Sequence, residues 1–310
     1  MEKKIKKAII TGITGQDGSY LAQFLLSMGY EVHGIVRRSS FEDEQKLDNI
    51  KNIKDQLTLH EGSLSDHLVT FKIFSRVMPD ECYHLAASSF VNYSFNNEFE
   101  TMNNNFHSTH YLLSTIREVK KDCKFYFAGS SEMFGEPNVS PQTEETPFNP
   151  KSIYGISKVA SHYLVKNYRK KENLFACTGI MYNHESSRRG SQFVTKKIIS
   201  SAVKIKLGIQ DKLYLGNLEA KRDWGYAPDY VKAMWKVLQA DKADDFILAT
   251  GKLYSVREFL DITFSYLDLS YKDYVEVDPK FFRSSERNPL CGDSSKIKNI
   301  IGWKNTKSLE

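Results

Sequence analysis

Cysteine is scarce in this sequence, with only four among 310 residues. The four lie far apart, without a Cys-x-x-Cys pair or a neighbouring pair of histidines, at Cys82, Cys123, Cys177 and Cys291. Such spacing signals neither a zinc site nor a disulfide framework. We therefore expect no metal site, and thiols that stay reduced in a cytoplasmic protein.

A long apolar run is also lacking. No stretch reaches the about 18 apolar residues that a transmembrane helix requires, so we expect a protein that does not span a membrane and has no membrane partner. The basic residues 1–7 are followed by an apolar run that ends at Gly12. This run is too short for the core of a secretory signal peptide.

Neither sign of charge is in large excess. Lys and Arg number 43 and Asp and Glu number 38, which leaves a net charge of +5. Such a small excess does not indicate nucleic acid binding and is compatible with an anionic small-molecule ligand. Hydrophobic residues make up 41% and charged residues 26% of the chain, as in ordinary globular proteins, which argues against wholesale disorder.

The first half of the chain alternates short apolar runs with helical patterns, which favours βαβ units and a parallel sheet. The predicted strands are 7–11, 31–36, 81–86, 124–128 and 246–249, and the predicted helices are 18–28, 105–119, 193–207 and 229–238. We predict an α/β protein with a doubly wound parallel sheet. Residues 1–180 would form the dinucleotide domain, to which about 222–255 return, and residues 181–310 would mainly form a smaller substrate-binding lobe.

Three glycines separate the first predicted strand from the first helix, in Gly12-Ile-Thr-Gly15-Gln-Asp-Gly18. Gly12 permits a tight turn, Gly15 lets the backbone approach a pyrophosphate, and Gly18 lets the helix pack on the strand. An ordinary glycine-rich turn is the alternative, but the position at a helix N-terminus favours phosphate binding. We predict a Rossmann-type site formed by Gly12, Thr14, Gly15, Gln16, Asp17 and Gly18.

The end of the second strand discriminates between the two nicotinamide dinucleotides. An NAD-binding fold places an acidic residue there, about 20 residues beyond the glycines. Here Arg37, Arg38 and Ser39 follow Val36, and their guanidinium and hydroxyl groups suit a 2′-phosphate. We therefore predict NADP, with NAD as the alternative. Four residues at the ends of the next two strands are also predicted to line this site, although packing alone explains them equally: Ser63, Leu64, Leu85 and Ala86.

A Tyr-x-x-x-Lys pair, Tyr154 and Lys158, places both side chains on one face of a helix. A lysine one turn away, beside a positive nicotinamide ring, is expected to lower the pKa of the phenol from about 10 towards neutrality. Tyr154 would then act as a base towards a sugar hydroxyl, and Lys158 would hold the nicotinamide ribose.

Ser130 and Glu132 follow a predicted parallel strand, at the end where ligands of such sheets bind. Ser130 would donate to the substrate oxygen. Glu132 would remove a proton from the carbon beside a new ketone and then protonate a departing hydroxyl, which is elimination chemistry. Simple alcohol oxidation requires no carboxylate, so Glu132 favours elimination. The alternative is that Glu132 is a solvated loop residue.

The glycine motif, Ser130-Ser-Glu132 and Tyr154-x-x-x-Lys158, together with residues 182–190 and 222–230, give the chain a resemblance to extended short-chain dehydrogenase/reductases. It is most similar to the GDP-mannose 4,6-dehydratases. This resemblance implies conversion of a GDP-hexose to a GDP-4-keto-6-deoxyhexose, by oxidation at C4, loss of water across C5 and C6, and hydride return to C6. It also implies a tightly held NADP and a homodimer or homotetramer, with residues 37–40 near a neighbour's cofactor.

The resemblance assigns further roles to matching positions. Ser89 would face the hexose, Asn183 the diphosphate, Lys197 the nucleobase, Arg222 a phosphate, and Arg283 with Glu286 the nucleotide ribose and phosphate. Departures from the family pattern cluster in the hexose half, namely Phe90, Asn92 and Ser108, so the hexose is either mannose or another, chiefly N-acetylglucosamine as in relatives that serve legionaminic acid synthesis. A nucleotide-sugar 4-epimerase or 4-reductase, which does not need Glu132, and a non-enzymatic NADP-sensing protein are the alternatives.

Overall fold

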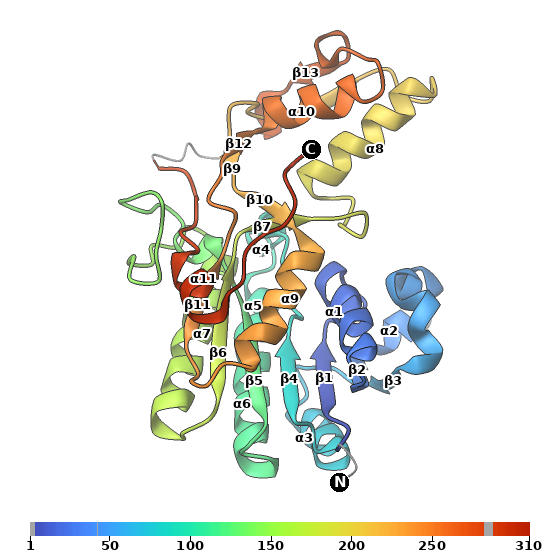
Figure 1. The fold of residues 1–310 in the computed structure, drawn as a ribbon. Coiled ribbons are helices and arrows are strands. Elements are labelled where there is room, and N and C mark those ends of the chain that lie inside the picture. The colour runs from blue at the N-terminus through green and yellow to red at the C-terminus, as the bar shows by residue number, and fades with distance from the viewer. Residues whose placement is uncertain (1–3, 42, 282–287) are drawn as a thin grey trace.

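The computed structural model describes residues 4–41, 43–281 and 288–310. Within them, one sheet of seven strands lies at the centre of the molecule, in the order β11-β6-β5-β4-β1-β2-β3 (Figure 1). Its strands are β1 (Lys7–Thr11), β2 (Glu31–Val36), β3 (Thr58–Glu61), β4 (Glu81–His84), β5 (Lys124–Ser130), β6 (Ala176–Met181) and β11 (Asp245–Leu248). All neighbouring pairs in this sheet are parallel, which confirms the predicted doubly wound sheet.

Helices cover both faces of the sheet, because successive strand residues point to opposite sides and both sides are apolar. In β1, Ala8 and Ile10 pack into the core beneath α1 (Gln16–Ser27) and α9 (Ala227–Leu238). Ile9 packs into the opposite core. The helices on that side are α3 (His67–Val77), α6 (Ser108–Val119) and α7 (Ile153–Lys171). None of the helices in the described part of the chain is both long and apolar enough to cross a bilayer.

A second cluster of elements stands beyond the carboxyl ends of the strands, at the top of Figure 1. It comprises α8 (Val194–Lys206), β8 (Leu213–Leu215), α10 (Val256–Ser265) and β13 (Val275–Val277), and it has an apolar core of its own. Although α9 and β11 follow α8 in the chain, they pack with the sheet. The division into domains at residue 180 stays a prediction.

Short elements complete the described residues. The helical ones are α2 (Arg38–Phe41), α4 (Val91–Ser94), α5 (Glu98–Met102), α11 (Ser295–Ile301), a π-helical turn (Asn103–His107) and the 3₁₀ segments Glu44–Gln56, Ser131–Met133, Tyr271–Asp273 and Pro279–Phe281. Paired short strands are β7 (Asn183–Glu185) with β10 (Trp224–Tyr226), β9 (Lys221–Arg222) with β12 (Tyr254–Ser255), and β13 with β8.

The predicted elements agree closely with the observed ones, and the differences have local causes. The strand expected to reach Ala86 ends at His84, and beyond it the Thr11 side chain takes over the pairing: the amides of Leu85 and Ala86 donate to the Thr11 hydroxyl at 3.2 and 3.1 Å, and that of Leu85 also donates to the Thr11 carbonyl at 3.3 Å. The helix expected from Asn105 begins as α6 at Ser108, since the π-helical turn precedes it.

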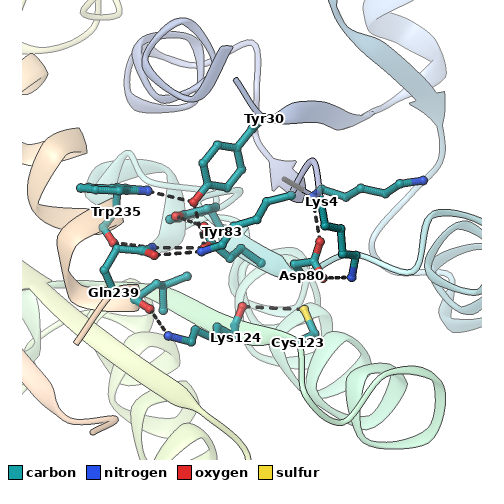
Figure 2. A network of polar contacts seen from close by, with 12 residues as sticks. Lys4, Tyr30, Asp80, Tyr83, Cys123, Lys124, Trp235 and Gln239 are labelled. Carbon is teal, nitrogen blue, oxygen red and sulfur yellow. Dashed lines mark hydrogen bonds and ion pairs between the residues drawn. The ribbon is translucent and has the colours of Figure 1, made fainter. Parts of the chain in front are cut away.

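Glu81 organises a buried polar network at the amino ends of the strands, and Figure 2 labels its members Tyr30, Tyr83 and Gln239. Its carboxylate, in a side chain only 1% exposed, accepts hydrogen bonds from Lys6 Nζ at 3.0 Å, the Tyr30 hydroxyl at 3.0 Å and the Tyr83 hydroxyl at 2.7 Å. Gln239 Nε2 also donates to it, at 3.1 Å, from the end of α9. The network therefore joins β1, β2, β4 and α9, at the end of the sheet away from the strands' carboxyl ends.

We expect Glu81→Ala to lower the free energy of unfolding by about 3 kcal/mol, because a buried hydroxyl and an ammonium group lose their acceptor. Asp122→Ala is the matched control, since this carboxylate also pairs with a lysine but is 80% exposed. Its removal should change the free energy by about 0.5 kcal/mol or less. Urea unfolding of both variants measures the difference, and equal losses would contradict the stabilising role of the network.

Candidate functional site

A cleft of about 1480 Å³ opens at the carboxyl ends of the sheet strands. Ligands of doubly wound sheets bind where the strand order reverses, and here the order reverses between β1 and β4. Most of the predicted site residues line this cleft: Gly12, Thr14, Gly15, Gln16, Asp17, Gly18, Arg37, Ser63, Leu64, Leu85, Ala86, Ser89, Ser130, Glu132, Tyr154, Lys158, Asn183, Lys197 and Arg222.

Four predicted site residues are not placed there. Arg38 and Ser39 belong to the one-turn helix α2, and neither is among the described residues that line the cleft, whereas Arg37 and Ser40 are. Helix α2 begins at Arg38, directly after Arg37. Arg283 and Glu286 lie outside the described residues.

The glycine turn leaves no room for side chains. Gly12 has φ +72°, and a Cβ built on it would lie 2.9 Å from the Ala86 amide nitrogen. A Cβ on Gly18 would lie 2.2 Å from the Gly12 carbonyl oxygen. The N-cap of α1 is Gly15, which has no side chain to accept from the first-turn amides. These amides are therefore available to an anion, and the turn fits the pyrophosphate of a dinucleotide.

The Lys158 side chain is held by the end of β5 rather than extended into the open cleft. Its Nζ donates to the Ala128 carbonyl at 2.8 Å and lies 5.8 Å from the centre of the Tyr154 ring. Burial disfavours the charged amine and lowers the pKa of Lys158 to about 7. The side chain lies on the same helix face as Tyr154, one turn along α7, as the spacing predicts.

The protein's own groups raise the pKa of Tyr154, whereas the expected lowering depends on a positive nicotinamide ring beside the phenol as well as on the lysine. Burial raises the pKa of Tyr154 to about 12, because an apolar surrounding disfavours the phenolate. The hydrogen bond with Ser130 lowers this pKa, and the nearby carboxylate of Glu132 raises it. Because the Lys158 amine is engaged with the Ala128 carbonyl, the lysine alone does not bring the phenol towards neutrality.

Ser130 and Glu132 reach the cleft because β5 ends in a tight 3₁₀ turn, Ser131–Met133. The Ser130 hydroxyl accepts from the Glu132 amide at 3.2 Å, which holds the two residues together. Helix α7 packs directly on this turn, since a Cβ on Gly155 would lie 2.6 Å from the Glu132 carbonyl oxygen. Gly155 therefore permits the approach that brings Tyr154 beside Ser130 and Glu132.

Asn105 is a site-supporting residue that the sequence reasoning missed. Its amide group donates to the Ser157 hydroxyl at 3.0 Å and accepts from the Ser88 amide at 2.8 Å. It thereby ties the loop after β4, which lines the cleft, to α7 next to Lys158. The available signal was the run of three asparagines in an otherwise apolar helical pattern.

Two further cleft residues come from one short loop. Arg188 and Arg189 follow β7 and line the cleft. Arg188 donates to the Ser19 hydroxyl at 3.0 Å and to Gln23 Oε1 at 2.9 Å, both on α1. The Arg189 guanidinium lies 3.6 Å from the centre of the Phe193 ring. The two adjacent arginines in the sequence were a visible signal, since they stand within one of the stretches that carry the resemblance.

Comparisons with known proteins agree with this geometry. The family profile described as GDP-mannose 4,6 dehydratase matches residues 9–310. GDP-mannose 4,6 dehydratase 1 of Arabidopsis thaliana is 48% identical and covers 97% of this chain and 86% of the relative. GDP-mannose 4,6-dehydratase of Vibrio cholerae is 42% identical and covers 96% and 89%. A dTDP-glucose 4,6-dehydratase from Bacillus anthracis, solved in complex with NAD, shares the fold, with a TM-score of 0.86, 19% identity and coverage of 98% and 93%.

We expect Gly155→Ala to cost about 1–3 kcal/mol of stability, because the added methyl group collides with the Glu132 backbone. It should also lower turnover by about 10²-fold, since the phenol and the carboxylate are pushed apart. Ile156→Ala is the control, as that side chain is 43% exposed on the same turn of α7. Thermal unfolding and steady-state kinetics measure both effects, and a fully active Gly155 variant would refute the close approach.

Proposed function

We infer, because the chain belongs to the GDP-mannose 4,6-dehydratase family, that the cleft brings a nicotinamide dinucleotide against the hexose of a GDP-sugar. The protein is a GDP-sugar 4,6-dehydratase, a hydro-lyase that removes one water from its substrate. The observation that carries the assignment of residue roles is the presence of Glu132 in the same cleft as Ser130 and Tyr154. An oxidation alone requires the serine and the tyrosine, whereas an elimination also requires an acid–base group such as the carboxylate.

The glycine turn and the Lys158 side chain would hold the dinucleotide. When bound, the oxidised nicotinamide supplies a hydride acceptor and a positive charge beside the phenol of Tyr154. That charge favours the phenolate against the burial that raises the pKa of Tyr154 to about 12. Tyr154 then takes the proton of the C4 hydroxyl, while Ser130 donates a hydrogen bond to the same oxygen.

Glu132 carries the elimination. The ketone at C4 acidifies the C5–H bond, and the Glu132 carboxylate takes this proton. The same group then protonates the hydroxyl that departs from C6 as water. Return of the hydride to C6, and of one proton to C5 in place of the one that Tyr154 took from the C4 hydroxyl, would complete the reaction. The overall reaction then converts a GDP-hexose into a GDP-4-keto-6-deoxyhexose and one water, with no net change in the cofactor. A 4-epimerase or 4-reductase of the same fold requires no acid at this place, so the position of Glu132 favours the dehydratase.

The basic side of the cleft suits the GDP moiety. Lys197, whose Nζ donates to the Tyr214 carbonyl at 2.8 Å, lies 4.6 Å from the centre of the Phe281 ring. We propose that this pair contacts the guanine, with Asn183 and Arg222 on the diphosphate. The assignment of Arg283 and Glu286 to the nucleotide ribose and phosphate stays a prediction.

The hexose end carries residues unusual for the family. Phe90, in the loop after β4, packs edge-on against Phe193, at the start of α8, with 5.9 Å between the ring centres. Ser89 also lines this end. We propose GDP-mannose and GDP-N-acetylglucosamine as the two candidate substrates, to be distinguished by incubating the protein with each and weighing the product for the loss of one water.

We expect Glu132→Gln to lower dehydration by about 10³-fold with both candidate sugars, because the amide cannot take or return a proton. Binding of the dinucleotide, measured by calorimetry, should be retained. Glu136→Gln is the matched control, since Glu136 pairs with Lys151 at 2.8 Å and is not among the described residues that line the cleft. Unchanged dehydration in the Glu132 variant would show that Glu132 does not carry the elimination.

We propose NADP as the cofactor, because Arg37 lines the cleft directly after β2. Arg37→Ala should weaken NADP binding by about 10- to 100-fold through loss of a charge-assisted hydrogen bond to the 2′-phosphate. NAD binding should change little. Arg38→Ala is the control, because Arg38 is not among the described residues that line the cleft. Calorimetric titration of each variant with both dinucleotides measures this, and an equal loss for NAD and NADP would argue against 2′-phosphate recognition.

A further inference from the structure

Asp17 places a carboxylate where an anion is expected to bind. It lies in the first turn of α1, beside the glycine turn proposed to hold the dinucleotide pyrophosphate, and it lines the cleft. Two negative groups at such a distance repel each other, most strongly in a partly dehydrated site. A free carboxylate here would therefore oppose the ligand that the helix N-terminus attracts.

The structure supplies a partner for this carboxylate. Asp17 Oδ2 lies 2.8 Å from His184 Nε2, and Asp17 Oδ1 accepts from Gln16 Nε2 at 3.0 Å. The other ring nitrogen, His184 Nδ1, lies 2.7 Å from the Tyr182 carbonyl oxygen. While Asp17 is ionised, both ring nitrogens of His184 face oxygen atoms that can only accept. In that state only the doubly protonated, positively charged imidazole satisfies both contacts.

The electrostatic surroundings agree with a charged pair. Burial disfavours both charged groups, but their mutual attraction outweighs it, so the pKa of His184 is raised and the pKa of Asp17 is lowered. Arg189 lowers the pKa of His184, while the nearby carboxylate Glu185 has a pKa that burial raises. Three phenols also lie near the pair. The ring of Tyr230 stacks on that of His184, with 4.5 Å between the ring centres, and burial raises the pKa of Tyr230. The pKa values of Tyr126 and Tyr154 are raised mainly by burial and also by the charge of Asp17.

We propose that the imidazolium of His184 cancels the charge of Asp17, and so keeps the first turn of α1 receptive to the pyrophosphate of the dinucleotide. His184 is then a positioning residue, which acts on the ligand through Asp17. The inference rests on the proposed dinucleotide site. His184 also belongs to β7, next to Asn183, and its carbonyl accepts from Gln16 Nε2 at 3.0 Å. His184 therefore joins α1, on the dinucleotide side of the cleft, to β7, on the sugar-nucleotide side.

The proposal predicts a pH dependence of cofactor binding. The pair is intact between the lowered pKa of Asp17 and the raised pKa of His184. As the pH rises through the raised pKa of His184, the imidazole loses its proton, and Asp17 keeps only Arg189 as a positive neighbour. Affinity for NADP should therefore fall at alkaline pH, which calorimetric titration from about pH 6 to about pH 9 measures.

Three variants separate charge compensation from a structural tie. We expect His184→Gln to weaken NADP binding at neutral pH by about tenfold, Asp17→Asn to flatten the pH profile of binding, and the double variant to regain most of the affinity that His184→Gln loses. Asp17→Asn also controls for titration of the dinucleotide's own phosphates. Ser186→Ala is the matched control, since its hydroxyl donates to Gln16 Oε1 at 2.9 Å and joins the same segments without charge.

Some results would overturn the proposal. If the double variant binds as weakly as His184→Gln, or if the wild-type profile is as flat as that of Asp17→Asn, His184 is only a structural tie. Nitrogen-15 NMR of the wild-type protein tests the proposal without any substitution, because both ring nitrogens of His184 should be protonated at neutral pH. A neutral ring would refute it. If the wild type does not bind NADP or NAD at all, the proposed function fails instead.

Discussion

The site depends on how closely the ends of β1 and β4 approach each other. A Cβ on Gly12 would lie 2.9 Å from the Ala86 nitrogen, so the chain can pass here only without a side chain. The Thr11 hydroxyl holds the same junction by accepting from the Leu85 and Ala86 amides. This junction places the glycine turn against the loop after β4, and both walls of the cleft follow from it.

A second constraint joins the two halves of the cleft. Contacts run from the first turns of α1 to β7 and the loop that follows it: Gln16 and Asp17 contact His184, Gln16 contacts Ser186, and Arg188 contacts Ser19 and Gln23. The segment that carries Asn183 is therefore fixed to the helix proposed to hold the dinucleotide. A GDP-sugar whose diphosphate is held by Asn183 would keep its hexose at a constant position relative to the nicotinamide, which hydride transfer requires.

The sequence allowed the sheet and most of the cleft to be predicted, because both arise from local patterns. Apolar runs define the strands, and Gly12, Gly15 and Gly18 mark the turn between the first strand and its helix. The sequence did not allow contacts between side chains far apart in the chain to be predicted. Asp17 and His184 stand 167 residues apart, so Asp17 was interpreted as a cofactor contact without its partner. Burial, which spacing does not report, raises the pKa of Tyr154 in the protein alone, so the predicted lowering depends on the positive nicotinamide ring.

The burial of Tyr154 has a use in the proposed reaction. With a pKa of about 12, the phenol is fully protonated at neutral pH, while Lys158, with a pKa of about 7, is only partly charged. The same low polarity that disfavours the phenolate strengthens the effect of any charge placed beside it. Tyr154 should therefore become a base when the neighbouring ring is positive, and return to the protonated form when that ring is neutral. Because the oxidised nicotinamide is positive and the reduced one neutral, the tyrosine would take its proton during oxidation at C4 and not before.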